Sequence, residues 1–180
     1  MSTPETTLIV PAAPVPGNPA SPVRVLSVEV EDKPGVLFRV CGMVQRRGFN
    51  IEGLSVGRAE TPGRSRMTLT VHAGHAEVDQ VEKQLSRLIE VISIEDLTQH
   101  DHLSRELALF RLAVTGEVRR RAIEAAGRAG ASVVDVTPDE IVVEVAGDPA
   151  VIEGLRAALA EYGIAELARS GPIAIRTQLR

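Results

Sequence analysis

The sequence predicts an α+β fold in which one βαββαβ unit follows another along the chain. Three observations lead to this prediction. The 180 residues are 44% hydrophobic and 24% charged, a balance typical of a globular protein with a buried core. Segments with alternating apolar residues, typical of strands, are interspersed with segments whose apolar residues recur every three or four positions, typical of helices. The same order of segments then occurs twice.

The first unit is predicted over residues 23–98. A strand begins at Val23 and places Leu26, Val28 and Val30 on one face. A helix follows, in which Val36, Val40 and Val44 recur at intervals of four. The remaining elements expected are a β-rich segment over 49–56, an alternating strand over 66–71, a helix over 78–88 and a strand over 91–97.

The second unit is predicted over residues 104–180, after a short polar linker over 99–103. Its expected strands are 107–114, 131–136, 141–145 and 164–168, and its expected helices are 117–128 and 149–160. This order in both units is the split βαβ, or ferredoxin-like, arrangement. The sequence therefore predicts two tandem ferredoxin-like domains, and no site-like cluster of residues stands out in the second domain or its tail.

The first 22 residues are predicted to form a disordered arm, because they contain six of the 11 prolines. They contain no Lys or Arg, so a secretory signal is not expected there. The apolar runs are far shorter than the roughly 20 residues that a membrane-spanning helix requires. The single cysteine, Cys41, lies on the apolar helix face and favours a reducing, cytoplasmic compartment.

Charge and motifs exclude several function classes. The net charge of −4, with three phenylalanines, one tyrosine and no tryptophan, argues against nucleic-acid binding. His72 and His75, like His100 and His102, lie near turns without a neighbouring cysteine, so no metal site is predicted. Phosphate-binding glycine motifs and catalytic residues are not found either.

One face of the first predicted sheet is polar without being uniformly charged; its residues are Arg66, Thr68, Thr70, Ser93 and Glu95. An antiparallel sheet with helices on one side leaves its other side and its edges open. We therefore expect another domain or subunit to cover this face, and we expect the protein to form homo-oligomers.

The turn from the first strand into the first helix is the most informative local segment. Pro34 sets a helical φ, Gly35 permits close approach of a ligand, and the first helical amides lack internal partners. Such amides form a site for a carboxylate. Asp32 is expected either to cap the helix or to bind an ammonium group, and a capped helix start without any ligand remains the alternative from these residues alone.

Beyond this turn, the sequence closely resembles the regulatory, or small, subunit of acetohydroxyacid synthase, also called acetolactate synthase. The matching segments are VEDKPGVLFRV (30–40), QRRGFNIE (45–52), SRMT (65–68), EKQL (82–85), RELAL (105–109), DVTP (135–138) and ARSG (168–171). The resemblance implies a protein without its own catalysis. It implies that the first unit is an ACT domain that dimerises and binds a branched-chain amino acid, typically valine, at the seam between two protomers.

The same resemblance implies roles for individual residues. The effector-binding residues would be Asp32, Pro34, Gly35, Val36 and Leu37 from one protomer, with Asn50 and Ile51 from its partner. Asp32 stands where the family often has Asn, and a carboxylate there attracts the ammonium of the effector but repels its carboxylate. Ser65, Arg66 and Met67 would contact the catalytic subunit. Thiamine diphosphate, FAD and Mg²⁺ would belong to that subunit, and none to this chain.

Two other functions share part of the pattern. The segment GVLFR (35–39) is similar to the phosphate loop of acylphosphatases, but Asp32 is unsuited to a phosphate cradle and Arg39 is expected on the solvent side of its helix. A tandem-ACT transcriptional or glycine-cleavage regulator would share the architecture, but not the segments at 65–68 and 136–138.

Overall fold

The computed structural model describes residues 22–177, apart from the side chains of residues 75 and 76. The arm expected over 1–22 lies outside the described residues, except for Pro22. The first domain contains one antiparallel sheet of four strands in the order β2-β3-β1-β4. Its elements are β1 (Val23–Glu31), α1 (Val36–Arg46), β2 (Ile51–Arg58), β3 (Arg64–His72), α2 (His75–Leu85) and β4 (Val91–Asp96).

A short 3₁₀ helix, η1 (Leu97–Gln99), leads into the second domain. The elements of that domain are β5 (His102–Leu112), α3 (Gly116–Arg128), β6 (Ser132–Val136), β7 (Ile141–Gly147), α4 (Pro149–Leu159), η2 (Ala160–Tyr162), β8 (Ile164–Arg169) and β9 (Ile173–Arg176). Its main strand order is β6-β7-β5-β8, and β9 pairs with the first part of β5. The prediction of two tandem βαββαβ units is confirmed.

The periodicities of the sequence produce two separate cores. In the first domain Leu26, Val28 and Val30 of β1 pack against Val36, Val40 and Val44 of α1, the spacings that predicted these elements. In the second domain the core centres on Phe110, which is fully buried. The inner face of α3 consists of alanines, which let the helix approach the sheet closely.

Two elements differ from the expectation. The strand β5 begins at His102, five residues before the expected start, so it includes His102 and Leu103 of the range expected to be a linker. The strand β9 was not predicted at all, because four residues are too few for a clear alternation. Its register with β5, from His102 opposite Arg176 to Arg105 opposite Ile173, joins segments about 70 residues apart in sequence.

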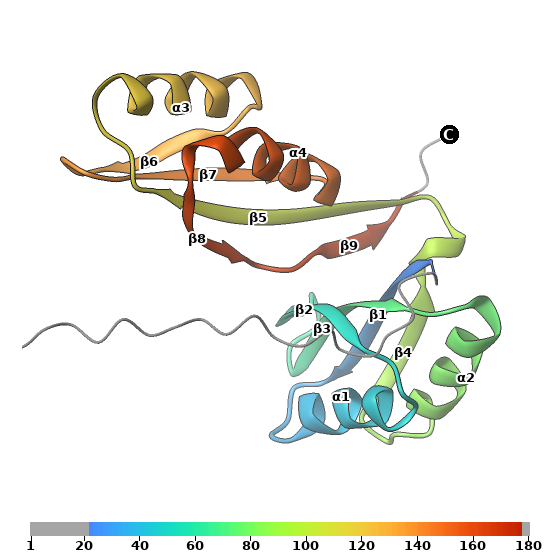
Figure 1. Ribbon diagram of the computed structural model, residues 1–180. Coiled ribbons are helices and arrows are strands. Elements are labelled where there is room, and N and C mark those ends of the chain that lie inside the picture. The colour runs from blue at the N-terminus through green and yellow to red at the C-terminus, as the bar shows by residue number, and fades with distance from the viewer. Residues whose placement is uncertain (1–21, 178–180) are drawn as a thin grey trace, which may run out of the picture.

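β9 lies between the two domains and faces the open side of the first sheet, opposite α1 and α2 (Figure 1). Ala174 is buried there, and its N–H donates to Thr68 Oγ1 at 3.4 Å. Arg176 pairs with Glu95 at 3.0 Å. The second domain of the same chain therefore covers part of the polar face for which a covering domain or subunit was expected.

Candidate functional site

The loop between β1 and α1 is open to solvent and is hydrogen-bonded to the β2–β3 hairpin. Gly35 adopts a left-handed conformation (φ +84°), which strains any residue with a Cβ. The N–H of Asp32 donates to the carbonyl of Gly63 at 2.8 Å, so the loop lies beside the β2–β3 hairpin. No side chain caps α1, so Asp32 does not serve as the cap that was one alternative.

The predicted effector residues of this loop present different groups. The side chain of Val36 is buried in the core, so only its backbone faces the loop, and its N–H already donates to the Lys33 carbonyl at 3.3 Å. Asp32, Pro34 and Gly35 are exposed, and Leu37 is 42% exposed. The loop therefore offers backbone amides, one free-standing carboxylate and an exposed apolar side chain.

Asn50 and Ile51 lie at the other end of α1 from Gly35. The 11-residue helix spans about 16 Å at 1.5 Å per residue. Asn50 is exposed just before β2, and Ile51 is the half-buried first residue of that strand. A single chain therefore does not bring the two halves of the predicted effector site together.

The three residues predicted to contact the catalytic subunit lie on β3 but differ in exposure. Ser65 and Met67 are buried, and Met67 belongs to the first core. Arg66 faces the open side of the sheet and pairs with Glu29 at 3.2 Å and with Glu60 at 3.0 Å. A backbone hydrogen bond to Glu60, and then the charge of Arg66, lower the pKa of Glu60. Of the three residues, only Arg66 presents a side chain that a partner can reach.

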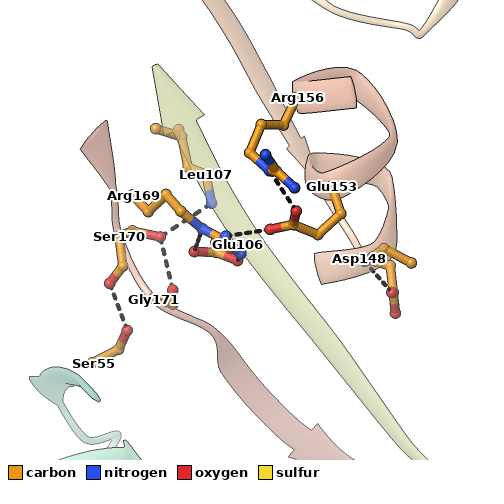
Figure 2. Close-up of polar contacts among 10 residues, drawn as sticks. Ser55, Glu106, Leu107, Asp148, Glu153, Arg156, Arg169, Ser170 and Gly171 are labelled. Atoms are coloured by element: carbon orange, nitrogen blue, oxygen red, sulfur yellow. Dashed lines mark hydrogen bonds and ion pairs between the residues drawn. The ribbon is translucent and has the colours of Figure 1, made fainter. Parts of the chain in front are cut away.

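A second polar cluster lies in the second domain, where no site-like cluster was predicted (Figure 2). Arg169 donates from Nε and Nη2 to the two carboxylate oxygens of Glu106, at 2.8 and 2.7 Å, and from Nη1 to Glu153 at 2.6 Å. The Glu106 side chain is only 3% exposed. Its hydrogen bond is the main reason that the pKa of Arg169 is raised above its usual value.

A signal for this cluster was present in the sequence. Glu106 precedes Ala108, Phe110 and Leu112 in the alternation that faces the core of the second domain. A carboxylate at such an inward position requires a cationic partner. The sequence could not identify Arg169 as that partner, because it lies 63 residues away.

The segment after Arg169 makes the closest contact between the domains. Ser55 Oγ donates to the Ser170 carbonyl at 2.9 Å (Figure 2). Gly171 has a φ of +71°, and a Cβ there would lie 3.3 Å from the Leu54 carbonyl oxygen. A Cβ on Gly53 would lie 3.0 Å from Pro172 Cδ. A side chain at either position would push the loop and β2 apart by a few tenths of an ångström, and the φ of Gly171 disfavours any other residue there.

Within residues 22–177, apart from side chains 75 and 76, the structure places no three His, Cys, Asp or Glu residues where they could hold a metal ion together. No helix in this part of the chain is long and apolar enough to cross a membrane.

Comparison with known proteins connects both domains to one family. A family model described as the AHAS small subunit-like ACT domain matches residues 26–93, and a model described as the small subunit of acetolactate synthase matches residues 105–178. An acetolactate synthase small subunit from Mycobacterium bovis is 45% identical over 150 residues, covering 83% of this chain and 89% of the relative. A probable acetolactate synthase small subunit from Methanothermobacter thermautotrophicus is 42% identical, covering 84% and 91%.

The crystal structure of the acetolactate synthase small subunit from Thermotoga maritima matches this fold with a TM-score of 0.80 at 28% sequence identity. The match covers 88% of this chain and 99% of that one, so it includes both domains and the way they follow each other. The resemblance seen in the sequence is confirmed. Because relatives above 40% identity match nearly their whole length, this chain belongs to the family of acetolactate synthase small subunits, with an ACT domain and the regulatory role that this membership indicates.

Proposed function

We propose that this chain activates the catalytic subunit of acetohydroxyacid synthase and makes it sensitive to feedback inhibition by valine or another branched-chain amino acid. Effector binding and dimerisation are assigned to residues 23–98. In this proposal the chain acts in the cytoplasm and holds no cofactor. Thiamine diphosphate, FAD and Mg²⁺ act in the catalytic subunit.

The proposal is supported by where the predicted effector residues lie: the Gly35 loop is beside the β2–β3 hairpin at one end of β2, and Asn50 is at the other end. β2 is an edge strand of the first sheet, and Asn50 immediately precedes it. The hairpin after β2 touches the effector loop through the Asp32–Gly63 hydrogen bond. When a second protomer pairs its β2 antiparallel around a two-fold axis, its Asn50 comes to the end of this strand that lies beside Gly35.

The chemistry of the two half-sites suits an amino-acid zwitterion. The amides of Gly35 and Leu37 lie at the positive end of α1, whose first turn contains no acidic residue, and they can donate to the effector carboxylate. The Asp32 carboxylate attracts the effector ammonium, and the Asn50 amide can bind either charged end. Leu37 supplies an apolar contact for a branched side chain.

Contact with the catalytic subunit is assigned to the sheet face around Arg66. Its planar guanidinium is suited to bidentate pairing with a carboxylate of the partner. Glu60 is largely exposed beside it, so a partner carboxylate can replace Glu60 without leaving a buried charge unpaired. In this assignment Ser65 and Met67 act by holding the strand in place.

The test is reconstitution with a catalytic subunit of acetolactate synthase from the same organism. Acetolactate formation is measured for the catalytic subunit alone, after addition of this chain, and after further addition of valine, leucine or isoleucine. We expect the chain to stimulate the reaction and one of the amino acids to remove that stimulation. An unchanged rate in the presence of a stable complex would refute activation, and stimulation that none of the three amino acids reduces would refute feedback control.

Effector binding is tested without the catalytic subunit. A ligand present at 100 times its Kd raises the free energy of unfolding by about 2.7 kcal/mol. We therefore expect the melting temperature of this chain to rise with the same amino acid that inhibits the complex. D-valine serves as the matched control, because it has the same composition and charge but the opposite handedness.

A further inference from the structure

The sheet of the second domain has one covered face and one open face. α3 and α4 lie together on one side of it (Figure 1), and Ala108 and Phe110 of β5 are buried in the core on that side. The residues that alternate with the buried ones point to the other side of the sheet. The apolar residues on this open face are Leu103, Leu107 and Leu109 of β5, Val142 and Ala146 of β7, Ala168 of β8, and Ile173 and Ile175 of β9.

The open face exposes large apolar side chains to solvent. The first domain does not cover them, because it packs against the opposite side of β9, where Ala174 is buried and its N–H donates to Thr68. A contiguous exposed patch of this kind usually marks a protein interface. The exposed fractions are 40% for Leu103, 39% for Leu107, 62% for Ile173 and 61% for Ile175.

Two charged side chains near the centre of the open face have no partner of opposite charge among the described residues. Arg105 donates only to the backbone carbonyl of Ser104, at 2.7 Å. Glu144 is half-buried and makes no hydrogen bond or ion pair within the described part of the chain. Arg111 on the same face, in contrast, pairs with Glu166 at 3.2 Å. A half-buried carboxylate without a cation is unfavourable, so Glu144 would be stabilised by a cation from outside this chain.

The strand register places these two charges symmetrically. Leu107 of β5 lies opposite Ala146 of β7, and this row of residues crosses the middle of β5. Arg105 lies two residues before Leu107, whereas Glu144 lies opposite Leu109, two residues after it. Each charge is therefore roughly 7 Å from the row, one on either side of it. A two-fold axis along this row, between two facing sheets, brings Arg105 of one protomer close to the partner's Glu144, and the reverse.

The same axis brings large apolar side chains opposite small ones. Ile173 lies opposite Arg105, two residues before the row, and Ala168 lies opposite Leu109, two residues after it. Ile173 of one protomer therefore faces the partner's Ala168, where the small side chain leaves room for it. The two copies of Leu107 meet at the axis. Sheets that pack face to face in this way lie about 10 Å apart with their strands nearly aligned.

We propose that the open face of the second-domain sheet binds the same face of a second copy of this chain. A second copy is selected by the matched placement of Arg105 and Glu144, because one two-fold axis gives both charges a partner. Asp135, which is also on this face, lies on the edge strand β6 and stays exposed at the rim. The interface is separate from the β2 edge of the proposed function, so either can fail without the other, and a chain that uses both forms tetramers.

Sedimentation of the full chain across the micromolar range tests the apolar centre. Leu107→Lys places two ammonium groups at the axis and should raise the dissociation constant of this interface at least about tenfold. Val118→Lys, on α3 with a similar exposed fraction of 40%, is the matched control and should leave association unchanged. Unchanged association in Leu107→Lys would overturn the proposal. So would a dimer that Val56→Lys, at the β2 edge, weakens and Leu107→Lys does not.

Exchange of the two charges tests the pairing itself. Arg105→Glu and Glu144→Arg each place like charges opposite one another, so each should raise the dissociation constant about tenfold. The double variant restores the pair with reversed signs and should associate within about twofold of the natural chain. Arg121→Glu, exposed on α3, makes the same change of charge away from the face and should have no effect. A double variant weakened as much as the two single variants together would refute the interface.

Discussion

The two domains share an order of elements, yet their equivalent loops differ at the point where the first strand enters the first helix. In the first domain Gly35 precedes α1, no acidic residue follows in the first turn, and the loop is exposed. In the second domain Gly116, which is also left-handed (φ +52°), is the first residue of α3, and Glu117 follows it in the first turn.

Two hydrogen bonds from Arg119 also hold the second loop in place. Arg119 donates from Nε to the Val114 carbonyl at 3.1 Å and from Nη2 to the Pro138 carbonyl, which joins the loop to the turn between β6 and β7. Glu117 pairs with Arg120 and places a negative charge in the first turn of α3, where it repels a ligand carboxylate. A helix start at this position in the fold therefore does not by itself make a carboxylate site. The side chains around the helix start decide it.

The largest effect is expected from a carboxylate placed in the first loop. Gly35→Asp should abolish effector inhibition while activation of the catalytic subunit remains, because two carboxylates in a partly desolvated seam repel each other by several kcal/mol. Inhibition curves of acetolactate formation give the measurement. Gly116→Asp is the matched control, since it causes similar backbone strain in the equivalent loop and should leave inhibition intact. Equal loss in both variants would mean that the loops serve folding and not sensing.

The next largest effect is expected on the free energy of unfolding, when an ion pair of each domain is removed in turn. Arg169→Ala leaves the buried Glu106 carboxylate without its partner and should cost about 3 kcal/mol of the free energy of unfolding. Arg66→Ala in the first domain should cost below about 1 kcal/mol, because Glu60 is exposed and Glu29 keeps Arg64 at 2.8 Å. Urea denaturation of both variants gives the comparison. Similar costs would show that burial does not distinguish the two clusters.

A composite effector site predicts that a residue far from the loop matters nearly as much as the loop itself. Asn50→Ala should weaken effector binding by roughly 10- to 150-fold, because one charged end of the zwitterion loses its partner. A mixed dimer with Gly35→Asp in one chain and Asn50→Ala in the other should retain one intact site in a calorimetric titration. A mixed dimer without any intact site would place the whole pocket inside one protomer.

A smaller effect is expected at the edge of the first sheet. The isolated chain should sediment as at least a dimer at micromolar concentration, because pairing of two β2 edges satisfies their open backbone groups. Val56 lies on β2 and is 46% exposed. Val56→Lys should raise the dissociation constant of the dimer about tenfold, as lysines on edge strands discourage pairing. Val134→Lys, on the exposed edge strand β6, is the control and should not affect the dimer.

Much of the fold followed from local patterns. The spacing of Val36, Val40 and Val44 predicted α1, and all three side chains are buried in the first core. The alternation of Met67, Leu69 and Val71 likewise predicted the inward face of β3. These elements were predictable because each buries one face, and a buried face imposes the period of its element on the sequence.

The site was predictable to a lesser degree. The Pro34–Gly35 turn indicated an open helix start, and the structure places Gly35 in a left-handed conformation there. The helix predicted from the spacing of Val36, Val40 and Val44 already separated Gly35 from Asn50. Nothing in the residue pattern indicated that the Val36 amide donates to the Lys33 carbonyl. Hydrogen bonds of this kind depend on loop geometry, and the spacing of apolar side chains does not predict loop geometry.

Residue patterns along the chain are enough to predict the two βαββαβ units, the faces of their main helices and the family to which the chain belongs, because these depend on residues close together in the chain. How the two domains meet could be seen only in the folded chain. β9, the Arg169–Glu106 pair and the contact of Gly171 with β2 each join residues 63 or more positions apart. Such pairings arise because open sheet edges, an open sheet face and a buried carboxylate must all find partners, and which partner each one finds depends on the folded chain.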